Sequence, residues 1–148
     1  MEKLKDLREE NFLYQKDMAK ILNIKRSTYT SYEIGRDQIP IKHLNKLCQY
    51  FNISIDYAFG LTSTKNYENN RPTIVREKTA ERLKELRLEY ELTQEDIAKE
   101  LNTSRSTWTG YEYGKYQIPA LFLYAIAKKY HYSIDYLLGK IDYNPLKK

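Results

Sequence analysis

The chain has 148 residues, of which 41% are hydrophobic, with a formal net charge of +5 and a pI near 9.1. This mild basic excess favours a polyanionic partner without requiring one. The single cysteine, Cys48, excludes a disulfide framework and a cysteine zinc site. Because no apolar run is long enough for a membrane span and the charged amino terminus lacks a signal-peptide core, we expect a soluble protein of the reducing cytoplasm.

The sequence contains an internal repeat with two copies. Leu4 recurs as Leu83 and Gly60 as Gly139, a constant offset of 79 residues with no gap, and about half of the aligned positions are identical. A domain of roughly 60 residues is small but able to fold alone. We therefore predict two domains, 1–60 and 79–142, joined by a linker over 61–78 and followed by a tail over 143–148.

Apolar spacing predicts five short helices and no strand in each copy, so the expected fold class is all-α: two tandem five-helix bundles. In the first copy, helix 1 carries Leu4 and Leu7, and helix 2 runs from about Gln15 to Leu22. Asn23 suits a left-handed residue that ends helix 2 and turns the chain. Helix 3 is expected from Arg26 to the left-handed cap Gly35, and the second copy repeats this order.

Residues that favour a helix start predict the last two helices of the first copy. Pro40 suits the first turn of helix 4, and Ser54 is expected to cap a short helix 5 that Gly60 closes. The linker 61–78 has no sustained period, although Pro72-Thr73-Ile74-Val75 is β-prone. We expect the tail to be frayed.

Helix 3 has the features of a DNA-reading helix. Tyr29 and Tyr32 share one face, which we expect to be buried, and the other face is short and polar. Arg bonds guanine edges in the major groove, and Ser or Thr bonds several base edges. The expected DNA contacts of helix 3 in the two copies are Lys25, Arg26, Ser27, Thr30, Ser31, Ser104, Arg105, Ser106 and Thr109. Arg36 and Lys115, just past the helix, are expected phosphate contacts.

Lys25 is an unfavourable residue for its position. It stands where an N-cap acceptor is expected, and its charge opposes the helix dipole. Such local conflicts are more often functional than accidental. The second copy has a regular cap, Ser104, and has Gly110 in place of Ser31, so the two readers should prefer different half-sites.

The run from Leu92-Thr93-Gln94 through Ser104-Arg105-Ser106, Tyr111-Glu112 and Ile118-Pro119 resembles the Xre/Cro-type (lambda-repressor-like) helix-turn-helix family. The first copy matches less well, with Tyr14 in place of the usual Thr. The resemblance implies sequence-specific binding of double-stranded DNA by a repressor, usually as a two-fold dimer. It also implies phosphate contacts for Gln15 and Gln94. Structural ion pairs between helices 1 and 3 are implied for Arg8, Glu33, Arg87 and Glu112.

The expected function is therefore a DNA-binding transcriptional regulator, encoded by a bacterium or phage and associated with the nucleoid. The alternative is a protein-interaction module of antitoxin or antirepressor type, because Glu91, Glu95, Asp96 and Glu100 flank the reader of the second copy. The sequence leaves open whether the chain forms a homodimer or binds a protein partner. It also leaves open whether the surplus tyrosines form an association surface. No spacing suited to catalysis, metal binding, a cofactor or a small-molecule ligand is present, so no enzyme is expected.

Overall fold

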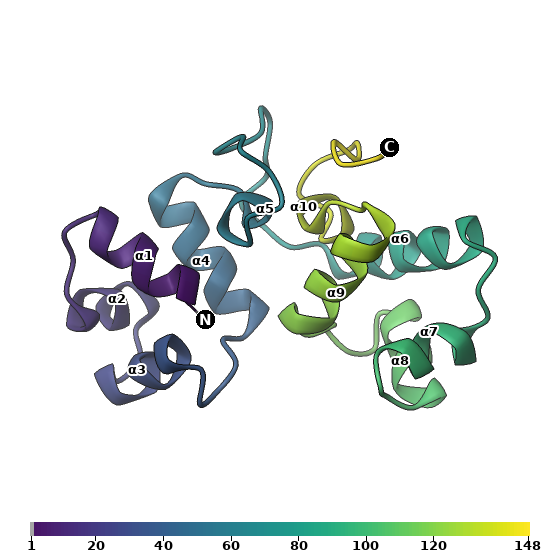
Figure 1. The fold of residues 1–148 in the computed structure, drawn as a ribbon, viewed down its shortest axis with the longest axis horizontal. Coiled ribbons are helices and arrows are strands. Elements are labelled where there is room, and N and C mark those ends of the chain that lie inside the picture. The colour runs from purple at the N-terminus through teal and green to yellow at the C-terminus, as the bar shows by residue number, and fades with distance from the viewer. Residues whose placement is uncertain (1) are drawn as a thin grey trace. The chain divides into compact units, whose positions relative to one another are not determined.

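The computed structural model describes residues 2–148, and within that range it contains ten helices and no strand (Figure 1). The chain divides into two compact units, Met1–Tyr67 and Glu68–Lys148. Each unit holds five helices. The predicted all-α fold with two tandem five-helix bundles is confirmed.

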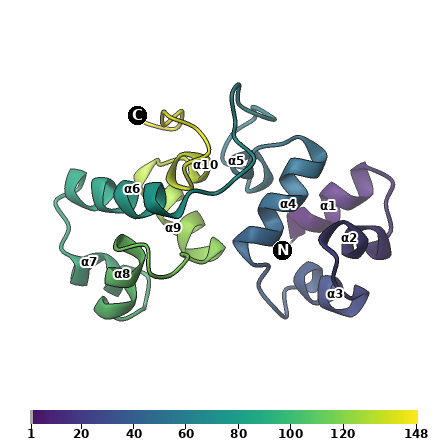
Figure 2. The same ribbon diagram turned by 180° about the vertical axis from the view of Figure 1, so that it is seen from behind.

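The two units repeat one helix order (Figure 2). The helices of the first unit are α1 (Glu2–Glu10), α2 (Gln15–Leu22), α3 (Arg26–Ile34), α4 (Ile41–Phe51) and α5 (Ile55–Ala58). Those of the second unit are α6 (Arg76–Glu89), α7 (Gln94–Glu100), α8 (Arg105–Glu112), α9 (Ala120–Tyr130) and α10 (Ile134–Leu137). In both units the second helix packs on the third, and the first helix packs on the third and the fifth.

Left-handed residues set the angle between the second and third helices of each unit. Asn23 has φ 56° and Asn102 has φ 55°, and the third helices are followed by Gly35 at φ 81° and Gly114 at φ 72°. Asparagine and glycine adopt this conformation at low cost, so the chain turns sharply at both ends of the third helix. These predicted turns are confirmed.

The core of each unit is built on the buried face of its third helix. Tyr29 in α3 and Trp108 in α8 occupy equivalent positions and are fully buried. The small residues Ala19 and Ala98 are also buried, and they lie on the second helices. Close helix packing there fixes α3 and α8 against their bundles and leaves their other faces outward.

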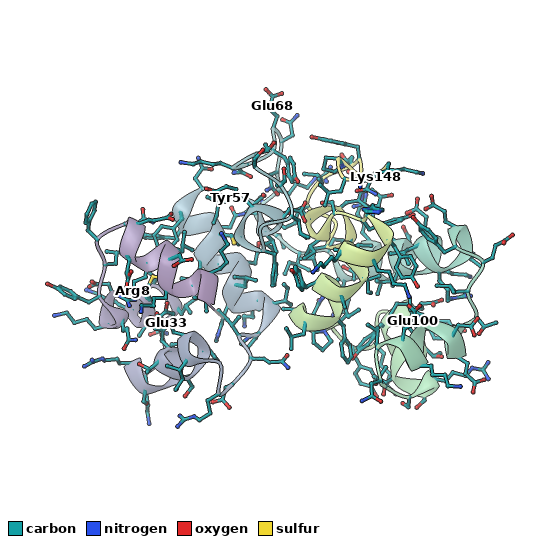
Figure 3. All side chains as sticks on the ribbon, viewed as in Figure 1. Arg8, Glu33, Tyr57, Glu68, Glu100 and Lys148 are labelled. Carbon is teal, nitrogen blue, oxygen red and sulfur yellow. The ribbon has the colours of Figure 1, made fainter. Side chains whose placement is uncertain are left out.

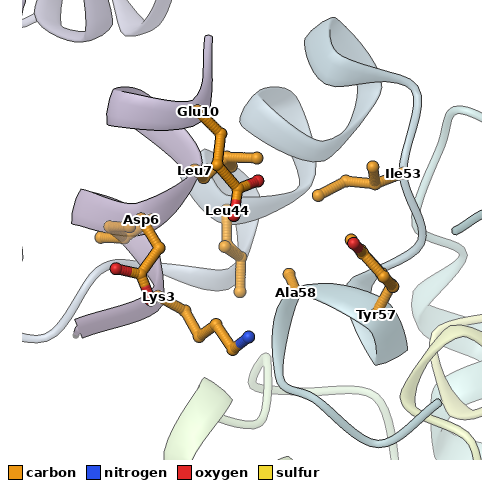
Figure 4. A pocket seen from close by; sticks show the side chains of 9 residues that line it. Lys3, Asp6, Leu7, Glu10, Leu44, Ile53, Tyr57 and Ala58 are labelled. Carbon is orange, nitrogen blue, oxygen red and sulfur yellow. The ribbon is translucent and has the colours of Figure 1, made fainter. Parts of the chain in front are cut away.

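The first unit contains a small hollow (Figure 4). Its lining residues come from α1, from α4 and from the segment that includes α5: Lys3, Leu4, Asp6, Leu7, Glu10, Leu44, Ile53, Tyr57 and Ala58. The second unit has Tyr132 at the position of Ile53, and this larger side chain is buried with its hydroxyl donating to Glu89. The two units therefore differ in the side chain that packs at this place.

The first part of the expected linker packs on the first unit. The backbone N–H of Ser54 donates to the carbonyl oxygen of Lys65 at 2.7 Å. The hydroxyl of Tyr67 donates to the fully buried carboxylate of Asp56 at 2.8 Å. These two contacts attach the chain beyond α5 to the bundle.

The last part of the expected linker packs on the second unit. Arg71 N–H donates to the Lys140 carbonyl at 2.8 Å, and Val75 N–H donates to the Leu138 carbonyl at 2.9 Å. The β-prone run therefore forms a backbone hydrogen bond to the second unit without being part of a sheet. α6 begins at Arg76, within the segment expected to be linker.

The segment expected to be a frayed tail forms hydrogen bonds and an ion pair with the second unit. Asn144 accepts a hydrogen bond from the Ser133 N–H at 2.9 Å and donates one to the His131 carbonyl at 3.0 Å. Lys147 forms an ion pair with Glu89 at 3.2 Å. These contacts tie the carboxyl-terminal segment to the end of α9, the start of α10 and α6.

The Tyr67–Asp56 bond generates a stability prediction. Tyr67→Phe removes the hydroxyl donor from a buried carboxylate, and we expect the first unit to lose about 1–3 kcal/mol of unfolding free energy. Urea unfolding followed by circular dichroism measures this loss. Trp108 is the only tryptophan, so its fluorescence reports the second unit, whose transition should stay in place. Tyr50→Phe, at an exposed tyrosine, is the matched control.

Candidate nucleic-acid interface

Arginine begins the third helix of each unit. Arg26 is the first residue of α3 and Arg105 the first of α8, and both residues are exposed. Ser27 and Ser106 follow them and are also exposed, whereas Thr30 and Thr109, one turn later, are half-buried. The outward face of each helix is therefore short, polar and cationic at its amino-terminal end.

An ion pair joins the first helix to the third in both units. Arg8 donates to the two carboxylate oxygens of Glu33 at 3.0 and 2.8 Å, and its remaining nitrogen donates to the Leu13 carbonyl at 3.0 Å (Figure 3). Arg87 makes the same bonds to Glu112 at 2.6 and 3.1 Å and to Leu92 at 3.0 Å. The bidentate geometry fixes the position of each third helix.

Glutamine and threonine extend this network toward the outward face. The Thr30 hydroxyl donates to Gln15 Oε1 at 2.9 Å, and Gln15 Nε2 donates to Glu33 at 3.4 Å. Gln94 and Thr109 repeat both bonds at 3.0 and 3.4 Å. The glutamine that begins the second helix is therefore held in one orientation relative to the third helix in each unit.

The ion pair in the first unit shifts the ionisation of its members. Burial favours the neutral form of Glu33, but the favourable interactions with Arg8, Tyr29 and Gln15 together outweigh it and lower the pKa of the Glu33 carboxyl below its ordinary 4.5. Burial, followed by the neighbouring Glu33 carboxylate, raises the pKa of Tyr29. Glu33 is thus a buried carboxylate stabilised in its charged form.

The N-caps of the third helices differ between the units. Ser104 accepts a hydrogen bond from the Thr107 N–H at 3.1 Å. Lys25 occupies the same position with extended backbone and makes no side-chain cap bond. The exposed ammonium of Lys25 therefore stands beside free N–H groups of α3, where an anion binds well.

Ser31 differs from the other predicted contacts because it is only 2% exposed. Its hydroxyl donates to the Ser27 carbonyl at 3.1 Å and accepts from Arg36 at 2.5 Å. A ligand on this face would meet the exposed Arg36 rather than the Ser31 hydroxyl. Lys115, the counterpart of Arg36, is also exposed.

Two further residues of the first unit belong to this surface. An open hollow at the start of α2 is lined by Arg8, Tyr14, Gln15, Lys16 and Arg26. Tyr14 is 70% exposed, and the Lys16 ammonium lies 5.4 Å from its ring centroid. Neither Tyr14 nor Lys16 is among the DNA contacts that the sequence predicts. A charge difference between the two copies could have identified Lys16 from the sequence, because Glu95 stands at its position in the second copy.

Comparisons with known protein families match both units. Residues 4–57 match the model of a helix-turn-helix family, and residues 80–142 match that of a helix-turn-helix domain family. The chain is a tandem pair of helix-turn-helix domains. The Xre-type resemblance of the sequence is thereby confirmed.

Two relatives from Bacillus subtilis (strain 168) carry related helix-turn-helix sequence. The uncharacterized HTH-type transcriptional regulator YobD is 36% identical over 62 residues, which is 42% of this chain and 55% of YobD. The uncharacterized HTH-type transcriptional regulator YqaE is 31% identical over 75 residues, 50% of this chain and 65% of YqaE. The aligned region thus spans less than two thirds of either relative. No solved structure matches the tandem chain significantly.

Across residues 2–148, no cluster of three or more His, Cys, Asp or Glu side chains is arranged to hold a metal ion. In the same range, no helix combines the length and apolar composition needed to cross a bilayer.

The Glu33 ion pair predicts an acid-dependent stability. Because its folded pKa is lowered, Glu33 contributes stability above about pH 4.5, and that contribution disappears as the pH falls through the folded pKa. We expect Glu33→Gln to destabilise the first domain by about 3 kcal/mol at pH 7, with a smaller difference at pH 3. Urea unfolding between pH 3 and 7 measures this. A constant difference at every pH would contradict the assignment.

Exchanging the N-cap residues of the third helices between the two domains should change the stability of the two domains in opposite directions. Lys25→Ser supplies the missing cap acceptor and should stabilise the first domain by about 1 kcal/mol, while weakening binding to any duplex. Ser104→Lys should destabilise the second domain by a similar amount. Thermal unfolding and fluorescence anisotropy measure the two properties. A Lys25→Ser variant that gains stability without losing affinity would show that Lys25 has no role in DNA binding.

Proposed function

We propose that this protein is a sequence-specific, double-stranded DNA-binding transcriptional regulator that represses by occupying its operator. Its two recognition helices, α3 and α8, would each read one half-site in the major groove. Domain boundaries at 1–60 and 79–142, the linker 61–78 and the tail 143–148 are part of this proposal. As a bacterial or phage regulator it would act in the cytoplasm at the nucleoid.

The observation that carries the proposal is the repeated geometry around Arg26 and Arg105. Both arginines are exposed at the start of a helix whose position is fixed by the same ion pair and the same glutamine–threonine bond. A rigidly held, short cationic helix end suits the major groove, where Arg bonds guanine O6 and N7. Ser27, Thr30, Ser106 and Thr109 extend the same face.

Residues around each recognition helix would contact the phosphate backbone. Gln15 and Gln94 begin the second helices, and Lys25, Arg36 and Lys115 flank the third. Such contacts position the protein without carrying sequence information. The first domain has more cationic groups here, because Lys16 and Lys25 stand where the second has Glu95 and Ser104, so we propose that it supplies the larger electrostatic share.

Two linked domains gain affinity through effective concentration. A second binding event on the same duplex becomes intramolecular and can strengthen binding by about 10²-fold or more if both domains engage. Because position 25 differs from 104 and position 31 from 110, the two half-sites would be unlike. A tandem chain would then recognise an asymmetric operator without forming a two-fold dimer.

The alternative is that one or both domains bind a protein instead of DNA, as an antitoxin or antirepressor does. Glu95 favours this for the second domain, since it is an exposed acid beside Gln94 at the start of α7. Under this alternative the second domain would contribute nothing to the salt dependence of DNA binding.

The arginines provide the test. Arg26→Ala should cost about 1–3 kcal/mol on a duplex selected from a random pool and relax specificity at one position. Gln15→Ala should instead weaken binding to all sequences and lower the salt slope. Anisotropy titrations at several salt concentrations measure both. An unchanged affinity for Arg26→Ala would oppose the proposal, and an effect of Arg26→Ala without one of Arg105→Ala would favour the interaction role for the second domain.

A further inference from the structure

Gly110 occupies an unexpected place in the middle of α8. A glycine inside a helix costs about 1 kcal/mol relative to alanine, and Gly110 is not among the glycines with positive φ, so its backbone does not require glycine. A Cβ atom at this position would lie 2.4 and 2.6 Å from two ring carbons of Tyr116. The reason for glycine is therefore the Tyr116 ring, which lies directly against the helix.

In the first domain, the loop after the third helix places a different side chain against the equivalent position of that helix. Tyr116 N–H approaches the Gly110 carbonyl at 3.4 Å, and Asp37 N–H donates to the Ser31 carbonyl at 3.2 Å. Ser31 and Asp37 are the repeat counterparts of Gly110 and Tyr116. In the first domain the Ser31 hydroxyl instead receives Arg36. Both loops therefore return to the same helix position, which Arg36 covers in the first domain and the Tyr116 ring covers in the second.

The Tyr116 ring extends the reading face of α8. Residues four apart lie on one face of a helix, so the ring over Gly110 continues the row that begins at exposed Ser106. Tyr116 is 48% exposed, which leaves part of the ring free. The Lys115 ammonium, proposed above to contact phosphate, lies 5.3 Å from the ring centroid. The ring is an apolar group held in place at the end of a polar helix face.

We propose that Tyr116, held against Gly110, recognises a thymine in the second half-site by apolar contact with the 5-methyl group. This inference rests on the proposed function. The thymine methyl is the one apolar group that a base pair presents in the major groove, and it is read by apolar contact. The first domain has Asp37 at the position of Tyr116 and therefore presents no ring at this place. The pair Gly110–Tyr116 thus makes the two half-sites chemically different.

The test replaces thymine by deoxyuridine, which lacks only the methyl group. With the full chain and a selected duplex, each thymine of the second half-site is substituted in turn, and affinity is measured by anisotropy. We expect one substitution to weaken binding about fourfold, the equivalent of about 0.8 kcal/mol for one buried methyl-sized group. Tyr116→Phe, which keeps the ring, should keep this difference. Tyr116→Ala should bind thymine and deoxyuridine duplexes equally.

Two further variants separate the ring from the fold. Gly110→Ala improves helix propensity but displaces the ring, so it should abolish the thymine preference without loss of thermal stability. Asp37→Ala is the control in the first domain and should leave every thymine–deoxyuridine difference unchanged. No deoxyuridine effect in the wild type, or an effect that persists in Tyr116→Ala, would overturn the inference. Failure to bind any duplex would overturn the proposed function itself.

Discussion

The bidentate ion pair between the first and third helices is the interaction on which each domain's outward face depends. Arg8 holds Glu33 and Arg87 holds Glu112, and in both cases the arginine also bonds the carbonyl that precedes the second helix. One guanidinium group therefore connects the first helix to the third helix and to the loop that leads into the second. Because the carboxylates are buried, loss of either partner would leave an uncompensated charge, which makes the arrangement strongly specified.

The repeat preserves this framework and changes what surrounds it. Glutamine and threonine bonds are the same in both domains, whereas the N-cap, the start of the second helix and the end of the recognition helix differ: Lys25 against Ser104, Lys16 against Glu95, and Ser31 with Arg36 against Gly110 with Tyr116. These differences lie around the recognition helix, while the network that positions the helix is retained. This distribution is consistent with two readers that share a geometry and differ in preference.

The contacts of the connecting and terminal segments show how local composition misleads. Residues 61–78 lack a hydrophobic period, yet Tyr67 reaches the buried Asp56 and Val75 pairs its backbone with Leu138. Single polar contacts made across the chain leave no periodic signal. The hollow beside Ile53 is likewise a matter of packing between α1, α4 and the segment of α5, which no single residue reveals.

The sequence by itself determined the duplication, the helix order and the turns at Asn23, Asn102, Gly35 and Gly114, because these depend on local periodicity and on backbone preferences of single residues. It also singled out the exposed arginines at the start of α3 and α8. Only the tertiary structure decided that Ser31 is covered by Arg36 and that Gly110 makes room for the Tyr116 ring. Those relations depend on side chains that meet only when the loop after each recognition helix folds back onto it.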